Sequence, residues 1–120
     1  MDKEILKKRT KTFSIEIGKL ILSLPFNVIN KNYSNQIVRC SSSVGANYRA
    51  ACRAKSKADF INKLKIVEEE LDESMFFLKL LVEFNPDKKE TITELWKDAN
   101  ELLSIIVASL TTLRKSLAQS

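Results

Sequence analysis

Apolar residues recur every three or four positions through four stretches of the chain, which is the pattern of amphipathic helices. In the first stretch, residues 3–24, Leu6, Phe13 and Leu20 repeat every seven positions. Pro25 ends this stretch because the residue before a proline is disfavoured in helical backbone angles. Residues 25–33 contain three asparagines and are predicted to form the only long loop.

Three further helices are predicted after this loop, over residues 34–53, 57–84 and 87–117. Ser56 has the character of an N-cap, and Asp59 places a negative charge at the start of the third helix. Asn85 is a candidate cap at the next break, where Pro86 suits a first helical position. The apolar periodicity and the positions of the capping and helix-breaking residues therefore both predict four helices.

Four helices of about 20–30 residues joined by short links pack most simply as antiparallel neighbours. We therefore expect an all-α fold, an antiparallel up-down four-helix bundle that forms a single domain over residues 1–120. No apolar run approaches the roughly 18–20 residues that span a bilayer, and the first residues lack the apolar core of a signal peptide. A cytoplasmic protein without membrane contact is predicted.

The middle of the second helix is rich in small residues. Gly45 is expected to let a neighbouring helix approach closely, and Asn47 to make an interhelical hydrogen bond; both are interpreted as structural. Cys40 and Cys52 lie 12 positions apart on the same predicted helix. At about 1.5 Å per residue they are some 18 Å apart, so a disulfide between them is excluded and reduced thiols are expected.

Charge is divided unequally along the chain. Residues 1–66 carry 14 lysines and arginines against four acidic residues, whereas residues 67–120 carry six against 11. A basic group spans the junction of the second and third helices, and we interpret it as a candidate phosphate-binding patch: Arg49, Arg53, Lys55, Lys57, Lys63 and Lys65. Lys7, Lys8 and Arg9 are candidate helpers. The alternative interpretation is a solvated surface that keeps the protein soluble.

The sequence offers no catalytic site, no metal site and no cofactor motif. It contains no histidine, so neither a histidine-activated serine nor the usual di-iron bundle centre can be assembled. The acidic run at residues 68–73 is interpreted as surface charge. Within it Glu69 and Glu73 are assigned structural roles, as partners of Arg49 or Arg53 on the preceding helix.

Residues 43–60, followed by Lys63-Leu64 and by residues 69–73, closely resemble the bacterial four-helix bundle family named for the 23S rRNA intervening-sequence proteins. The resemblance covers about a third of the chain. In helices one and four only length and apolar spacing agree. The family usually has a Tyr-Trp pair after its second acidic group, whereas this chain has residues 75–78, Met-Phe-Phe-Leu, at that place.

The resemblance implies a left-handed up-down bundle, often assembled as a homopentameric ring, with no catalytic residues established. A related branch accompanies the reverse transcriptases of diversity-generating retroelements. The function expected is therefore a non-enzymatic oligomer that binds structured RNA or DNA through the basic patch. The alternative is a protein-interaction subunit for a partner such as a reverse transcriptase, without nucleic-acid binding of its own.

Overall fold

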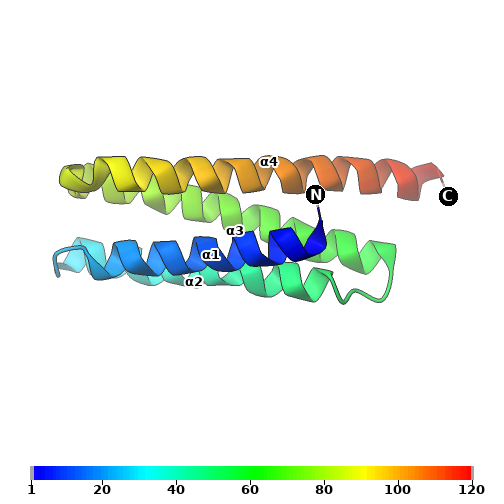
Figure 1. Cartoon of the computed structure of the whole chain (residues 1–120), viewed down its shortest axis with the longest axis horizontal. Coiled ribbons are helices and arrows are strands. Elements are labelled where there is room, and N and C mark those ends of the chain that lie inside the picture. The colour runs from blue at the N-terminus through cyan, green and yellow to red at the C-terminus, as the bar shows by residue number, and fades with distance from the viewer. Residues whose placement is uncertain (1, 120) are drawn as a thin grey trace.

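The computed structural model describes residues 2–119 as an all-α four-helix bundle. The elements are α1 (Lys3–Leu22), α2 (Val28–Ala51), α3 (Lys57–Phe84), the short 3₁₀ helix η1 (Pro86–Lys88) and α4 (Lys89–Gln119). Successive α-helices run antiparallel along the long axis of the molecule, which measures 52 Å (Figure 1). The start of α1 and the end of α4 lie at the same end of the bundle as the α2–α3 connection (Figure 1).

Three of the helices begin at side-chain caps. Asp2, Asn27 and Ser56 accept hydrogen bonds from backbone N–H groups in the first turns of α1, α2 and α3. Each bond satisfies one of the amides that a helix start leaves without an intrahelical partner. The prediction of Ser56 as an N-cap with Asp59 in the first turn is confirmed, since Ser56 Oγ accepts from Asp59 N at 3.1 Å.

The predicted long loop over residues 25–33 is wrong. Helix α2 begins at Val28 rather than Ser34, with Asn27 as its cap. Asn30, in the first turn of α2, is buried, and its Nδ2 donates to the Oδ1 of Asn85 at 3.0 Å. The asparagines that indicated a loop therefore cap the helix and bond to a distant element, which composition alone does not reveal.

The break after α3 is placed correctly, but Asn85 does not act as a side-chain cap for the segment that follows. Its Nδ2 donates instead to Leu81 O at 2.9 Å and to Asn30 Oδ1 at 2.8 Å. Pro86 occupies the start of η1 rather than of α4, which begins at Lys89. The end of α3 is thus tied to the start of α2.

One apolar core runs between the four helices. The predicted stripes are confirmed, because Phe13, Ile37, Val67 and Leu102 are each at most 1% exposed. The stripe of α4 ends earlier than predicted, since Leu113 is half-buried and Leu117 is exposed. Burial of apolar surface on this scale is the main force that holds amphipathic helices together.

Small residues bring α1 close to α2. A Cβ added to Gly45 would lie 3.6 Å from the backbone of Thr10, which is ordinary contact distance. Ser14 Oγ donates to Ser41 O at 2.7 Å across the same interface. The expectation that small residues of the second helix permit a close helix approach thus has a structural counterpart on α1.

Both cysteines are free thiols, as expected from their spacing. Cys40 is fully buried between α2 and α3 and accepts a hydrogen bond from Ser74 Oγ at 3.3 Å. Burial raises the pKa of the Cys40 thiol. Within residues 2–119 no helix is both long and apolar enough to cross a membrane.

Candidate nucleic-acid interface

The connection between α2 and α3 is a tight turn that holds cationic residues at one end of the bundle. The backbone N–H of Arg53 donates to Ala50 O at 3.1 Å, and that of Ala54 donates to Ala51 O at 3.0 Å. Asp59 Oδ2 then accepts from Lys55 N at 3.3 Å. These bonds fix the backbone at the point where the chain reverses direction.

The six cations of the predicted patch lie on this turn or on the adjoining turns of α2 and α3, and we call them the cationic end: Arg49, Arg53, Lys55, Lys57, Lys63 and Lys65. Five of them are exposed and Lys63 is half-buried. Within residues 2–119 no ion pair joins any of the six to a carboxylate. Their charges are therefore available to an external anion.

The cationic end is a cap over the bundle's end rather than one flat face. Arg53 lies beyond the last residue of α2, Ala51, and so does not share a helix face with Arg49. Lys63 and Lys65 are two positions apart on α3, which separates them by about 200° around the helix. Lys57 leans toward α4, where its Nζ donates to Ser116 Oγ at 2.7 Å.

Two of the three additional cations predicted to help bind phosphate form ion pairs within the protein. Arg9 donates to Asp98 and to Glu101 of α4, each at 2.9 Å, and so joins α1 to α4. Burial alone lowers the pKa of Arg9, but the two carboxylates outweigh it and the pKa is raised overall. Lys7 pairs with Glu4 at 3.1 Å, whereas Lys8 is exposed. Arg9 is therefore a structural clamp.

Apart from Asp59, which accepts from Lys55 N, the acids of α3 do not lie against the cationic end. Glu73 pairs with Arg39 of α2 at 2.5 Å, not with Arg49 or Arg53 as predicted, and Glu69 is exposed. The same Arg39 approaches the carboxylate of Glu70 at 3.6 Å. The sequence did not indicate a role for Arg39, because it lies outside the basic group. The acidic residues predicted on the neighbouring helix could have suggested an ion pair.

Glu70 is a carboxylate whose pKa is raised. Burial raises its pKa, Arg39 opposes the increase, and repulsion from Glu73 and Glu69 adds to it. Its Oε2 is buried without a hydrogen bond, at the edge of the hydrogen-bonding range of Arg39. The group helps to join α2 to α3 but is not well compensated for its burial.

Asn47 is half-buried, but its hydrogen bonds differ from those predicted. Its Nδ2 donates to the carbonyl oxygen and the hydroxyl of Ser43, at 2.9 and 2.8 Å. Both bonds stay within α2, one turn back along the helix. The expected interhelical bond is therefore not formed, because Ser43 supplies a nearer acceptor.

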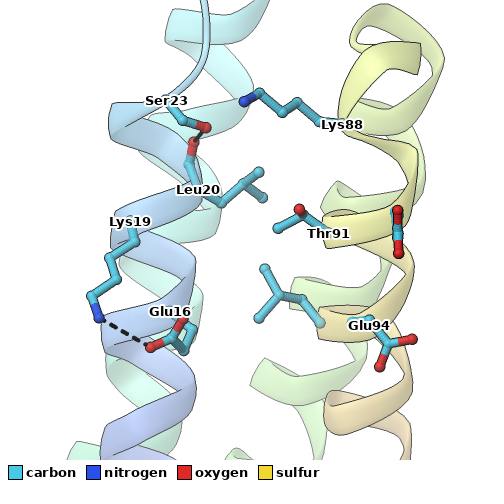
Figure 2. Close-up of a pocket in the computed structure, with 9 residues that line it drawn as sticks. Glu16, Lys19, Leu20, Ser23, Lys88, Thr91 and Glu94 are labelled. Atoms are coloured by element: carbon cyan, nitrogen blue, oxygen red, sulfur yellow. Dashed lines mark hydrogen bonds and ion pairs between the residues drawn. The ribbon is translucent and has the colours of Figure 1, made fainter.

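A hollow of about 540 Å³ lies at the other end of the molecule, between α1 and α4. Leu20 points into it from α1 and Thr91 from α4, while Glu16 turns to Lys19 in a 3.3 Å ion pair (Figure 2). Among the described residues no group of three or more His, Cys, Asp or Glu could hold a metal ion.

Fold and surface together define a four-helix bundle with uncompensated positive charge at one end. The chain belongs to the 23S rRNA-intervening sequence protein family, whose model matches residues 2–108. The resemblance first recognised in residues 43–73 is thus confirmed over nearly the whole chain.

A solved structure shares the fold. It is a protein with unknown function from the S23 ribosomal protein family of Bacteroides thetaiotaomicron VPI-5482, 30% identical to this chain with a TM-score of 0.79. The match covers 92% of this chain and 99% of that one. No curated protein matches the chain.

Proposed function

We propose that this protein is a non-enzymatic, oligomeric bundle that binds structured RNA or DNA through its cationic end. The observation that carries the proposal is that six cations gather around one turn without a carboxylate partner among residues 2–119. Two acids that could have paired with cations of this end have other partners: Glu73 pairs with Arg39, and Asp98 pairs with Arg9. Unpaired surface cations attract the phosphates of a nucleic acid and release the counterions condensed on it.

Assembly would strengthen a weak site of this kind. The family resemblance implies a homo-oligomer, often a five-membered ring, and a ring would present five cationic ends to one polyanion. Exposed apolar side chains outside the cationic end support subunit contact: Ile15, Val38, Phe76 and Phe84 are 42–55% exposed. Light scattering coupled to size-exclusion chromatography measures the number of subunits directly.

Charge reversal tests the binding. The variant Arg53→Glu, Lys55→Glu, Lys57→Glu should lose at least tenfold in affinity for a labelled RNA hairpin in fluorescence anisotropy at low salt, and its salt dependence should flatten. The matched control, Lys88→Glu, Lys89→Glu, Lys97→Glu, changes the net charge equally but away from the cationic end. The proposal fails if both variants bind alike, or if the wild type does not bind at low salt.

A second candidate function is that of a protein-interaction subunit, for a partner such as a reverse transcriptase. The aromatic side chains on the α2–α3 side favour it. Tyr33 lies 6.1 Å from Phe77 and 6.0 Å from Phe84, ring centre to ring centre, and Phe84 is 53% exposed. Aromatic residues are enriched at protein interfaces, although Tyr33 and Phe77 are half-buried here. Co-purification with a neighbouring gene product, without affinity for nucleic acid, would favour this function.

A further inference from the structure

A second hollow opens beside the cationic end, where α1, α3 and α4 meet. Its volume is about 360 Å³. Its walls are mainly apolar and include Leu6, Leu64, Ile106 and Leu113. The hydroxyls of Ser109 and Thr112 also line it. Apolar walls with a few polar groups are the usual lining of a small-molecule or side-group pocket.

The Phe60 ring, with the ammonium of Lys3 above it, forms one side of this hollow. Lys3 Nζ lies 5.1 Å from the centre of the Phe60 ring, and both residues line the hollow. Lys3 is exposed and stands at the first residue of α1, where the helix dipole disfavours a positive charge. The cation–π contact is a weak restraint at an exposed site, so the ammonium can move off the ring.

The charge around the hollow favours an anion. Lys57, three positions before Phe60 on α3, reaches across to Ser116 of α4. Three carboxylates lie nearby and each is engaged: Asp2 caps Glu4 N at 2.7 Å, Glu4 pairs with Lys7, and Asp59, next to Phe60, accepts from Lys55 N at 3.3 Å. Lys3 and Lys57 are not paired with any carboxylate in the described part of the chain.

We propose that this hollow receives one unpaired nucleobase, which stacks on Phe60 in the place of the Lys3 ammonium. The displaced Lys3 and the nearby Lys57 then bind the flanking phosphates. The proposal rests on the function proposed above and names the form of nucleic acid recognised: a single strand, loop or bulge rather than a continuous duplex. Aromatic stacking next to a cationic surface is how proteins hold single-stranded nucleic acid, whereas the bases of a duplex are already stacked and paired.

Trp96 also carries a lysine, since Lys79 Nζ lies 5.3 Å from its ring centre beside a smaller hollow of about 220 Å³, but this pair lies away from the cationic end. Phe76 is 55% exposed on α3 and contacts Phe77, with ring centres 5.5 Å apart, but among the described residues no lysine or arginine stacks on it. Phe76 is therefore the matched control for Phe60. Both can be changed to leucine, which keeps apolar bulk and helix propensity.

The test compares a labelled single-stranded oligouridylate with a blunt duplex of equal charge in fluorescence anisotropy. Phe60→Leu should weaken binding of the single strand roughly 5- to 100-fold, the range for loss of one stacked base, and leave duplex binding unchanged. Phe76→Leu should change neither. The inference is overturned if Phe60→Leu binds the single strand as the wild type does, or if it weakens both ligands equally.

A photochemical readout on the wild type does not depend on any substitution. An oligonucleotide carrying 5-iodouridine should crosslink on irradiation to the peptide that contains Phe60; a crosslink confined to other peptides overturns the inference. The two proposals fail separately. If the triple charge reversal abolishes binding but Phe60→Leu does not alter it, only the nucleobase site is wrong, and if charge reversal has no effect, the cationic end itself is not the site.

Discussion

The carboxamides of Asn30 and Asn85, 55 positions apart in the chain, bond to each other in both directions. Asn30 Nδ2 donates to Asn85 Oδ1 at 3.0 Å, and Asn85 Nδ2 donates to Asn30 Oδ1 at 2.8 Å. Each Nδ2 also donates to a backbone carbonyl, that of Pro25 or of Leu81. The pair therefore closes the end of the bundle opposite the cationic end, where α1–α2 and α3–α4 connect.

Removing one member of this pair should destabilise the fold. Asn85→Ala leaves the buried amide of Asn30 without its partner, and we expect a loss of about 1–3 kcal/mol in the free energy of unfolding. Urea denaturation followed by circular dichroism measures it. Asn32→Ala, at an exposed position of α2, is the control and should change little. The double variant Asn30→Ala, Asn85→Ala should lose less than the sum of the single losses.

Gly45 should accept alanine but not a larger side chain. A methyl group there meets Thr10 at 3.6 Å, so Gly45→Ala is expected to stabilise the helix by roughly 0.5–1 kcal/mol. Gly18→Ala, where no atom lies within 4 Å of the added Cβ, should give a similar gain. Gly45→Leu should instead lower the melting temperature, because it pushes α1 away from α2. Equal behaviour of Gly45→Ala and Gly45→Leu would contradict the close approach.

Arg9 should stabilise α1 against α4 rather than bind nucleic acid. Arg9→Gln is expected to cost about 1 kcal/mol, a modest value because the carboxylates of Asp98 and Glu101 are 40% and 63% exposed. A double-mutant cycle with Asp98→Asn isolates the pair, and its coupling energy should fall as salt is added. The affinity of the folded variant for the RNA hairpin should equal that of the wild type. A tenfold loss of affinity would show that Arg9 contributes to binding.

Glu70 should make stability depend on pH. Its pKa is raised by burial, so its protonated form favours the folded state; this contribution is complete below the carboxyl's unfolded pKa and is lost as pH rises through the folded pKa. Glu70→Gln should therefore stabilise the protein at pH 7, by no more than about 1 kcal/mol, with little effect at pH 3. Urea titrations at the two pH values measure this. Glu69→Gln, at an exposed position, is the control.

The sequence predicted the helices well where packing decides them and poorly where single polar groups do. The apolar stripes, Ser56 and the break at Asn85 could be read from spacing, because burial and capping act locally along the chain. The start of α2 could not, since Asn30 is held by a residue of another element. The partners of Glu73 and Asn47 were missed for a similar reason: several acceptors and donors were within reach, and only geometry selects among them.

The candidate site was predictable as a group of residues but not as a surface. Six cations near one turn are evident from the chain itself, whereas the loss of Arg9 to Asp98 and Glu101 depends on how α4 packs on α1. The contact between Lys3 and Phe60 joins residues at the N-terminal ends of α1 and α3, which are far apart in the chain. No local pattern indicates it.

The positions of the cationic end and of the acids give the molecule an electric dipole moment along its axis. Residues 68–101, from α3 through η1 into α4, hold 11 acidic residues against four lysines, whereas residues 49–65 hold six cations against Asp59 alone. The field of a polyanion would orient the protein before contact, so that the cationic end meets the polyanion first. This orientation should raise the association rate constant at low ionic strength, and added salt should slow association more than it speeds dissociation.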